Sequence, residues 1–325
     1  MIEVTITRNN AGQKAEKFVR HYLEEAPLGF IYKAFRKKDI KVNGHWVNKD
    51  AVLQEGDVLR IYVTDAQLAD FRKPRPAEKK PFPYPIVYED ENVLLVNKPK
   101  GLLVYGDKKG VRETLGNAVL DYLYLQGEYD PNANSFTPSP AHRLDRNTSG
   151  LVIYGKTDAA LKELTILFKE RDDIKKTYLA LLVGDVKEGG EINLPLWKDA
   201  NSGRVYVRNL SEGGKTAITK YRIKKRYGEY TLVEAELVTG RTHQLRVHFA
   251  SIHHPIAGDE KYGDFASCRK VKALTGLESQ LLHAYAMEFG TLEGVLAPLS
   301  HRRFEAPLSE EEKRIISVLT ENPSL

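Results

Sequence analysis

Cysteine is almost absent from this chain of 325 residues, because Cys268 is the only one. A single thiol cannot form an intrachain disulfide, and it argues against a metal site built on thiolates. A chain of this length without disulfides is typical of a reducing compartment. We therefore expect a cytoplasmic protein.

Long apolar runs are absent as well. No stretch of about 18 consecutive apolar residues occurs, which is the length that a membrane-spanning helix needs. The first residues, Met1 to Thr7, also lack the positive start and the apolar core of a secretory signal. We therefore expect neither a membrane span nor a membrane partner.

An excess of positive charge is missing from three quarters of the chain. Residues 81–325 carry 33 Lys and Arg against 33 Asp and Glu, whereas residues 1–80 carry 16 against 11. The whole net charge of +5 thus lies in the first quarter. A basic module joined to a charge-balanced remainder predicts an anchor for a polyanion beside a domain with another task, and the length of the chain also indicates two domains.

Residues 1–63 have the pattern of a small folded unit. Residues 12–24 place apolar side chains on one helical face, and residues 28–38 predict a second short helix. Strands at 40–42 and 58–63 complete a helix-helix-hairpin module. We expect its basic side to bind the phosphates of a polyanion. The basic residues are Lys33, Arg36, Lys37, Lys38 and Lys41.

A proline-rich and basic segment follows at residues 64–85. Its prolines, Pro74, Pro76, Pro81, Pro83 and Pro85, favour extended polyproline-like backbone over helix. We therefore expect a linker here and a second domain over residues 86–325.

The second domain alternates short strands with a few helices. Apolar runs bounded by turns predict an α+β fold, with a mixed, mainly antiparallel β-sheet flanked by helices and loops. Strands are expected at 86–88, 92–96, 102–105, 151–154, 177–183, 217–224, 230–238 and 281–289. Helices are expected at 111–124, 158–169 and 242–252, and a last helix after the capping box of Ser309 and Glu312.

Residues 142–151, His-Arg-Leu-Asp-Arg-Asn-Thr-Ser-Gly-Leu, place two arginines around one carboxylate and run directly into an apolar strand. This pattern predicts a loop at the mouth of a sheet. The alternative is an ordinary charged turn in which Asp145 forms a surface ion pair. A carboxylate beside arginines stays ionised, which suits a nucleophile or base better than an acid. The motif contains no second acid. It therefore does not indicate the paired carboxylates that glycoside hydrolysis uses.

Further motifs occur in order along the chain. They are Asn-Lys-Pro-Lys-Gly-Leu at 97–102, Lys-Thr-Tyr at 176–178, Gly-Arg-Thr-His-Gln-Leu-Arg-Val-His at 240–248, His-Pro-Ile-Ala-Gly-Asp at 254–259 and Leu-His-Ala at 282–284. Together with residues 142–151 they resemble the RluA class of RNA pseudouridine synthases over about residues 86–305. The first 63 residues resemble the small S-four RNA-binding domain that often precedes such a catalytic domain.

The resemblance implies an isomerase that converts uridine in structured RNA to pseudouridine without a cofactor or a metal. Asp145 would be the nucleophile or base, and attack on the sugar, attack on the uracil and abstraction of a sugar proton all stay open. Arg246 would pair with Asp145, and Tyr178 would stack on the uracil. Arg143 would fill the space left by the flipped nucleotide or hold its phosphate. His142, Arg241 and Leu282 would complete the substrate site.

Two less specific interpretations apply to single residues. Tyr178 alone fits a sheet core, and Arg246 alone fits a helix surface. The histidines at 243, 248, 253 and 254 do not have the spacing of a zinc-binding helix, and we expect no metal there.

The RNA target is the other open question. The N-terminal module favours large-subunit ribosomal RNA, and the alternatives are transfer RNA or a catalytically silent protein that binds RNA or assists ribosome assembly. We expect a monomer.

Overall fold

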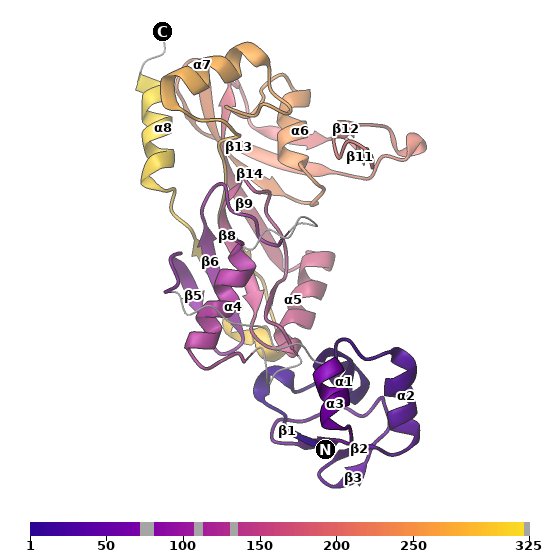
Figure 1. Ribbon diagram of the computed structural model, residues 1–325. Helices are drawn as coiled ribbons and strands as arrows, with labels where there is room; N and C mark the ends of the chain where they lie inside the picture. Colours follow the sequence, from indigo (N-terminus) through magenta and orange to yellow (C-terminus); the bar gives the residue numbers. More distant parts are fainter. Residues whose placement is uncertain (72–80, 107–112, 131–135, 322–325) are drawn as a thin grey trace.

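The computed structural model describes residues 1–71, 81–106, 113–130 and 136–321. Two groups of elements have separate hydrophobic cores (Figure 1). The smaller group is formed by the N-terminal 71 residues, and the larger is built on a sheet of ten strands. Within the described residues, no helix combines the length and the apolar character that are needed to cross a bilayer.

The N-terminal group packs two helices on a four-stranded antiparallel sheet with strand order β1-β4-β2-β3. The predicted helices and the hairpin are confirmed, and β1 and β3 are additional strands. Asn43 and Gly44 both have positive φ, as the type I′ turn between β2 and β3 requires. The elements are β1 (Ile2–Thr5), α1 (Ala15–Tyr22), α2 (Leu28–Arg36), β2 (Ile40–Val42), β3 (His45–Trp46) and β4 (Val58–Ile61).

Helix α3 (Asp65–Phe71) corrects the linker prediction. Leu68 and Phe71 pack against the N-terminal core, and the Phe71 ring centroid lies 4.8 Å from that of Phe30. The prolines that suggested an extended backbone all follow this helix, and the tertiary contacts of its two apolar residues stabilise it. Extended backbone is therefore wrong for residues 65–71, while Pro74 and Pro76 lie outside the described residues.

The large sheet has the strand order β10-β13-β14-β9-β15-β8-β6-β5, with β16 paired to β15 and β7 to β8. Among the described strands, β15 and β8 form the one parallel pair, so the predicted mixed, mainly antiparallel sheet is confirmed. The strands are β5 (Ile86–Glu89), β6 (Val93–Lys98), β7 (Ser139–Pro140), β8 (Ser149–Gly155), β9 (Ile174–Val183), β10 (Gly190–Asn193), β13 (Ile218–Arg226), β14 (Tyr230–Leu237), β15 (Leu282–Phe289) and β16 (Arg303–Glu305). A separate hairpin of β11 (Leu196–Lys198) and β12 (Val205–Val207) projects from the sheet (Figure 1).

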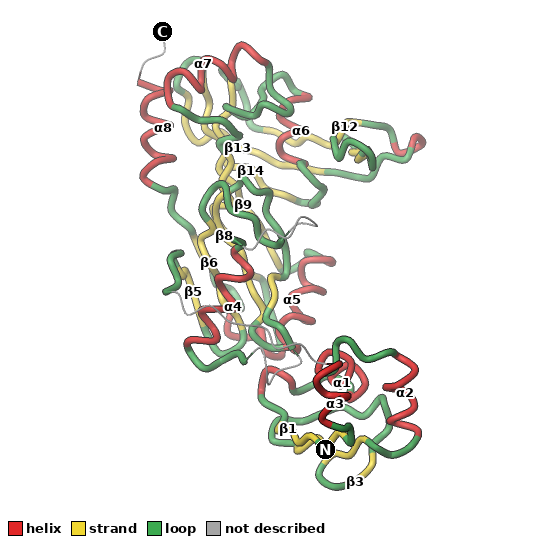
Figure 2. Tube along the Cα trace, in the orientation of Figure 1, coloured by secondary structure: helices red, strands yellow, loops and turns green. Residues whose placement is uncertain are grey.

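Helices cover both faces of this sheet (Figure 2). Successive residues of β6 alternate between two cores, because Leu94 and Val96 contact one cluster while Val93 and Leu95 contact the other. The first cluster includes residues of α4 and α6, and the second includes residues of α5 and the 3-10 segment Gly294–Leu299. The helices are α4 (Leu115–Leu125), α5 (Asp158–Glu170), α6 (Gln244–Ser251), α7 (Phe265–Thr275) and α8 (Glu310–Glu321).

Some local predictions for the large domain differ from the structure. Residues 102–105 do not form a strand and make only an isolated bridge from Leu103 to Thr114. Helix α7 and strands β7, β10, β11, β12 and β16 were not predicted. The first two residues of the helix predicted at 111–124 lie outside the described residues.

Polar contacts join the two groups of elements. Lys17 Nζ lies 2.7 Å from Asp158 Oδ1, and the Phe136 N–H donates to Asn10 Oδ1 at 2.8 Å. Arg8 forms an ion pair with Glu91. The N-terminal group thus lies at the end of the sheet away from α6 and α7 (Figure 1).

Candidate active site

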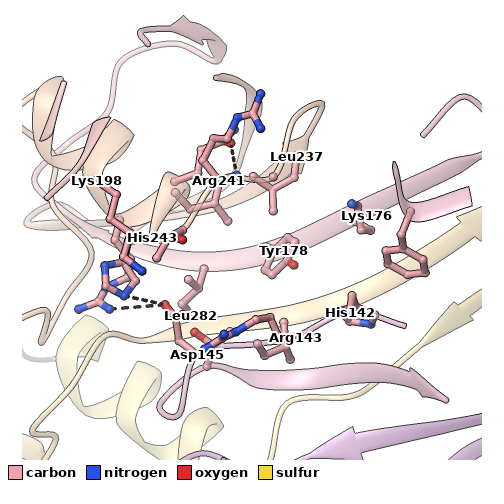
Figure 3. A pocket seen from close by; sticks show the side chains of 18 of the residues that line it. His142, Arg143, Asp145, Lys176, Tyr178, Lys198, Leu237, Arg241, His243 and Leu282 are labelled. Carbon is pink, nitrogen blue, oxygen red and sulfur yellow. Dashed lines mark hydrogen bonds and ion pairs between the residues drawn. The ribbon is translucent and has the colours of Figure 1, made fainter. Parts of the chain in front are cut away.

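A pocket of about 510 Å³ opens between the loop before β8, the strand β9 and the start of α6. It contains every catalytic and substrate-binding residue that the sequence predicts, and Figure 3 shows several of them facing one another. Six Lys or Arg side chains and one carboxylate, Asp145, line it. Over the described ranges, no cluster of three or more His, Cys, Asp or Glu is arranged to hold a metal ion.

The loop that carries Asp145 is held from below by Lys98. Lys98 is fully buried, and its Nζ donates to the carbonyls of Pro99, Leu102 and Arg146 at 2.9, 2.9 and 3.1 Å. Burial lowers the pKa of Lys98 to about 7, although the charges of Asp145 and Glu312 act in the opposite direction. Three carbonyl acceptors match the three N–H bonds of an ammonium group. The motif at residues 97–102 therefore anchors the loop of the motif at residues 142–151.

Gly150 is the glycine of the motif at residues 142–151, and the local backbone requires a glycine there. Its φ is +109°, and a Cβ at this position would lie 2.2 Å from the carbonyl oxygen of Ala284. Gly150 pairs with Ala284 where β8 runs parallel to β15. Only glycine permits this close approach, which brings Leu282 to the same pocket as Asp145.

Arg246 projects from the first turn of α6 and contacts two carboxylates. Its Nη1 lies 3.5 Å from Asp145 Oδ2, while its Nε and Nη2 each donate to Asp259 at 2.7 Å. Asp259 is 1% exposed and also accepts the backbone N–H groups of Lys261 and Tyr262. Burial acts against the charge of Arg246, but the hydrogen bonds and charge of Asp259, together with the charge of Asp145, raise its pKa. Asp259 therefore fixes the guanidinium that faces Asp145.

Tyr178 lies on β9 at the centre of the pocket, between Asp145 and Lys176 (Figure 3). Its side chain is buried at 8% exposure and belongs to the core cluster on this face of the sheet. Burial, followed by the charge of Asp145, raises the pKa of Tyr178. The phenol therefore keeps its proton at neutral pH.

The remaining predicted residues differ in their surroundings. The His142 ring stacks on Phe168 with 4.6 Å between centroids and accepts the N–H of Ile153 at Nε2. Burial, with a smaller effect of the Lys176 charge, lowers the pKa of His142 to about 3. His142 is thus neutral and packed. Arg143 and Arg241 are exposed at the pocket wall, and Leu282 is buried there.

Known proteins match this chain over most of its length. A profile of the family described as RNA pseudouridylate synthase matches residues 92–251. The ribosomal large subunit pseudouridine synthase C of Escherichia coli K12 is 34% identical over 324 residues, which cover 97% of this chain and 96% of that protein. The chain belongs to the RNA pseudouridine synthase family. The protein of the same name from Vibrio cholerae is 33% identical over 94% of this pseudouridine synthase and 92% of its own length.

Solved structures support the fold of this pseudouridine synthase. The human RNA pseudouridylate synthase domain containing 4 aligns with a TM-score of 0.58 at 22% identity, over 72% of this chain and 92% of that chain. The human RNA pseudouridylate synthase domain containing 1 aligns with a TM-score of 0.52 at 23% identity, over 76% and 97%. The predicted pseudouridine synthase fold is therefore confirmed.

Sequence reasoning missed part of the site of this synthase. His243 Nε2 lies 3.7 Å from Asp145 Oδ2 (Figure 3). Its Nδ1 lies 2.7 Å from the hydroxyl of Tyr262. Burial lowers the pKa of His243, which favours the neutral ring. Asp259 and Tyr262 lie within or just after the motif at residues 254–259, but no local pattern reveals which arginine or histidine they contact.

The basic residues predicted on the N-terminal module lie far from this pocket (Figure 1). Lys33, Arg36, Lys37 and Lys38 are exposed on and after α2, and Lys41 is half-buried on β2. Lys38 Nζ lies 4.9 Å from the ring centroid of Trp46, and Lys41 Nζ lies 5.2 Å from that of Tyr62. Among the ion pairs of the described residues, none involves these five side chains.

Proposed function

We propose that this RNA pseudouridine synthase uses Asp145 as the nucleophile or base on a flipped-out uridine of large-subunit ribosomal RNA. The observation that supports the catalytic part is that Asp145, Arg246 and Tyr178 line one pocket, although they come from a loop, a helix and a strand. In the reaction the N1–C1′ bond breaks and a C5–C1′ bond forms. The proton on C5 is released, and N1 gains a proton. No oxidant or reductant is needed.

Arg246 orients Asp145. Its bidentate contact to Asp259 fixes the orientation of the guanidinium. Because of this, Arg246 Nη1 already faces Asp145 in the free protein. Asp145 is therefore ready for the reaction before RNA binds.

Tyr178 forms the stacking surface for the uracil. An aromatic face in a buried pocket offsets part of the few kcal/mol that extrusion of a base from its stack costs. Because burial raises the pKa of Tyr178, its hydroxyl acts as a hydrogen-bond donor toward the reacting groups. Leu282 and the packed ring of His142 complete the walls, and the exposed Arg143 and Arg241 face the RNA backbone.

The N-terminal group acts as an S-four RNA-binding domain in this proposal. Its exposed basic residues on and after α2 form no ion pair with a described residue. Lys38 lies beside the exposed ring of Trp46, and Lys41 on β2 lies beside that of Tyr62. Cations next to aromatic rings suit phosphate contacts and base stacking. The names of the relatives in Escherichia coli and Vibrio cholerae favour large-subunit ribosomal RNA as the target. We retain the cytoplasmic location, the monomeric state and the lack of a cofactor as predictions.

The test measures tritium release from RNA labelled at C5 of uridine. Unmodified transcripts of large-subunit ribosomal RNA and of a set of transfer RNAs are incubated with the full chain and with Asp145→Asn. We expect release from the ribosomal transcript, and a loss of about a thousandfold or more in Asp145→Asn. Asp172→Asn is the matched control, because Asp172 is exposed outside the pocket.

Two outcomes of that test contradict the proposal in different ways. Full activity of Asp145→Asn excludes Asp145 as the reacting carboxylate. Release confined to transfer RNA leaves the chemistry intact and replaces the target.

A further inference from the structure

Three lysines are buried in the part of the chain that the structure describes, and one of them differs from the others. Lys98 donates to three carbonyls, and Lys156 contacts Glu89, Glu128 and the carbonyl of Asp90. Lys176 is 7% exposed, yet its ammonium group makes no hydrogen bond or ion pair with any described residue. Its one polar contact there is with the Phe168 ring, 5.2 Å from Nζ.

A second cation lies beside Lys176. Arg171 ends α5 in the left-handed conformation, with φ of 72°. Its guanidinium covers Gly240, where a Cβ would lie 2.5 Å from Nη2. Arg171 Nη1 is buried and has no hydrogen-bond partner among the described atoms. Gly240 thus gives Arg171 room in the pocket wall, but the protein supplies no acceptor for it.

These two cations repel each other. Burial and the charge of Arg171 lower the pKa of Lys176 to about 8, and burial and the charge of Arg241 lower the pKa of Arg171. The one acid of the pocket lining is Asp145, which already faces Arg246 and His243. Lys176 is buried and Arg171 is half-buried. Cations that are removed from water without a counter-charge destabilise a fold, so their presence in a pocket indicates a bound anion.

The position of this cation pair identifies the kind of anion. Lys176 and Tyr178 lie two residues apart on β9, so their side chains share one face of the sheet. Figure 3 shows Lys176 on the side of Tyr178 that faces away from Asp145. A ring stacked on Tyr178 with its sugar at Asp145 would leave the cation pair for a neighbouring group of the RNA strand.

We propose that Arg171 and Lys176 form a phosphate subsite, which binds a phosphodiester of the substrate strand beside the flipped uridine. This inference rests on the proposed function. A phosphodiester carries a permanent charge, whereas uracil is neutral until its glycosidic bond breaks. Two neighbouring cations that lack a counter-charge in the free protein therefore match a phosphate better than the edge of the base.

The test compares Lys176→Met and Arg171→Asn with the unchanged chain. Asn tolerates the left-handed conformation at position 171, so the helix end is kept. Lys175→Met is the matched control, because Lys175 is exposed and pairs with Glu236. The RNA probe is a labelled 12-nucleotide oligouridylate, and the same oligomer with neutral methylphosphonate linkages is the second probe.

We expect each pocket variant to bind the charged oligomer about tenfold more weakly. The slope of log affinity against log salt falls by about 0.7 per lost phosphate contact. The neutral oligomer binds equally to all variants. The midpoint of thermal unfolding of Lys176→Met stays the same or rises, because an uncompensated buried charge is removed. A residue with a purely structural role would show a lower midpoint.

Two results overturn the subsite. The first is an unchanged affinity and salt slope in both pocket variants. The second is an unchanged affinity with a lower single-turnover rate on the ribosomal transcript, which would assign the cations to the uracil edge. Because the oligouridylate contains a phosphate at every uridine, the subsite is judged even where the ribosomal transcript proves to be the wrong target.

Discussion

The carboxylate end of the pocket and the basic face of the N-terminal group treat charge in opposite ways. Asp145, Arg246 and Asp259 form a chain in which each charge meets an opposite one, with Arg246 and Asp259 buried and Asp145 half-buried. The cations on α2 are exposed and have no acid partner among the described residues. The first arrangement fixes geometry before RNA arrives, and the second leaves its charges available for phosphates.

This difference predicts that one site controls the chemical step and the other controls affinity for RNA. Paired and buried charges are screened little by salt and hold reacting atoms in place, so changes there alter the chemical step. Exposed cations release counterions when they meet RNA, so changes there alter affinity in proportion to salt. Variants at each site measure whether the division holds.

Apart from Asp145 itself, the largest effect is expected for Asp259→Asn. The change leaves the Arg246 charge buried without its bidentate partner, and we expect the free energy of unfolding to fall by about 3–5 kcal/mol. At a temperature where the variant is still folded, tritium release should fall at least about a hundredfold, because Arg246 no longer orients Asp145. Glu260→Gln, at the exposed neighbouring position, is the control. Wild-type turnover in Asp259→Asn would show that Arg246 needs no second carboxylate.

Two replacements of Tyr178 distinguish a role in stacking on the uracil from a role in proton transfer. Tyr178→Leu removes the aromatic face, which is worth about 1–3 kcal/mol per stacked base, so single-turnover rates should fall roughly tenfold to a hundredfold. Tyr178→Phe keeps the face and removes only the hydroxyl, and we expect a smaller loss. Equal losses in both variants would make the hydroxyl the essential group.

Removal of residues 1–71 tests the role of the N-terminal group. We expect affinity for the ribosomal transcript to fall roughly tenfold or more, while the single-turnover rate at saturating RNA stays within about threefold. The cut must follow α3, because Leu68 and Phe71 would otherwise expose apolar surface. A large decrease in the saturated rate would show that contacts such as Lys17 to Asp158 support the chemical step.

The smallest effect is expected when the exposed cations alone are neutralised. Gln at positions 33, 36, 37 and 38 should lower the salt slope by about 3 and leave the saturated rate unchanged. A matched control neutralises four lysines that already pair with an acid. They are Lys187, Lys270, Lys272 and Lys313, whose partners are Asp185, Glu229, Glu278 and Glu310. The same change in slope for both sets would show that the salt dependence of RNA binding does not depend on where the cations lie on the surface.

Sequence patterns predicted the elements that carry their own local signal. The last helix is an example, because Ser309 and Glu312 exchange hydrogen bonds at its start as a capping box does. The apolar period of α5 and the Asn43-Gly44 turn are others. In each case the residues that specify the element are close to one another in the sequence.

Features that depend on distant partners could not be predicted in this way. Helix α3 was missed because the prolines after it dominated the composition, while its stability comes from contacts of Phe71 with Phe30. The motifs indicated Asp145, Tyr178 and Arg246 together, but they did not show that Asp259 holds Arg246 or that His243 reaches Asp145. Arg171 belongs to no motif, and only the fold brings it beside Lys176.

The place of β15 in the sheet has a consequence for the order in which the protein is made. β15 lies between β8 and β9, yet it is the last long strand of the chain. The ribosome has therefore released the Asp145 loop and the Tyr178 strand well before the strand that joins them exists. Because chains fold from the N-terminus as they are synthesised, the pocket closes only when synthesis is nearly complete. Where the first domain binds RNA as proposed, a nascent chain would bind RNA before it is able to modify a single uridine.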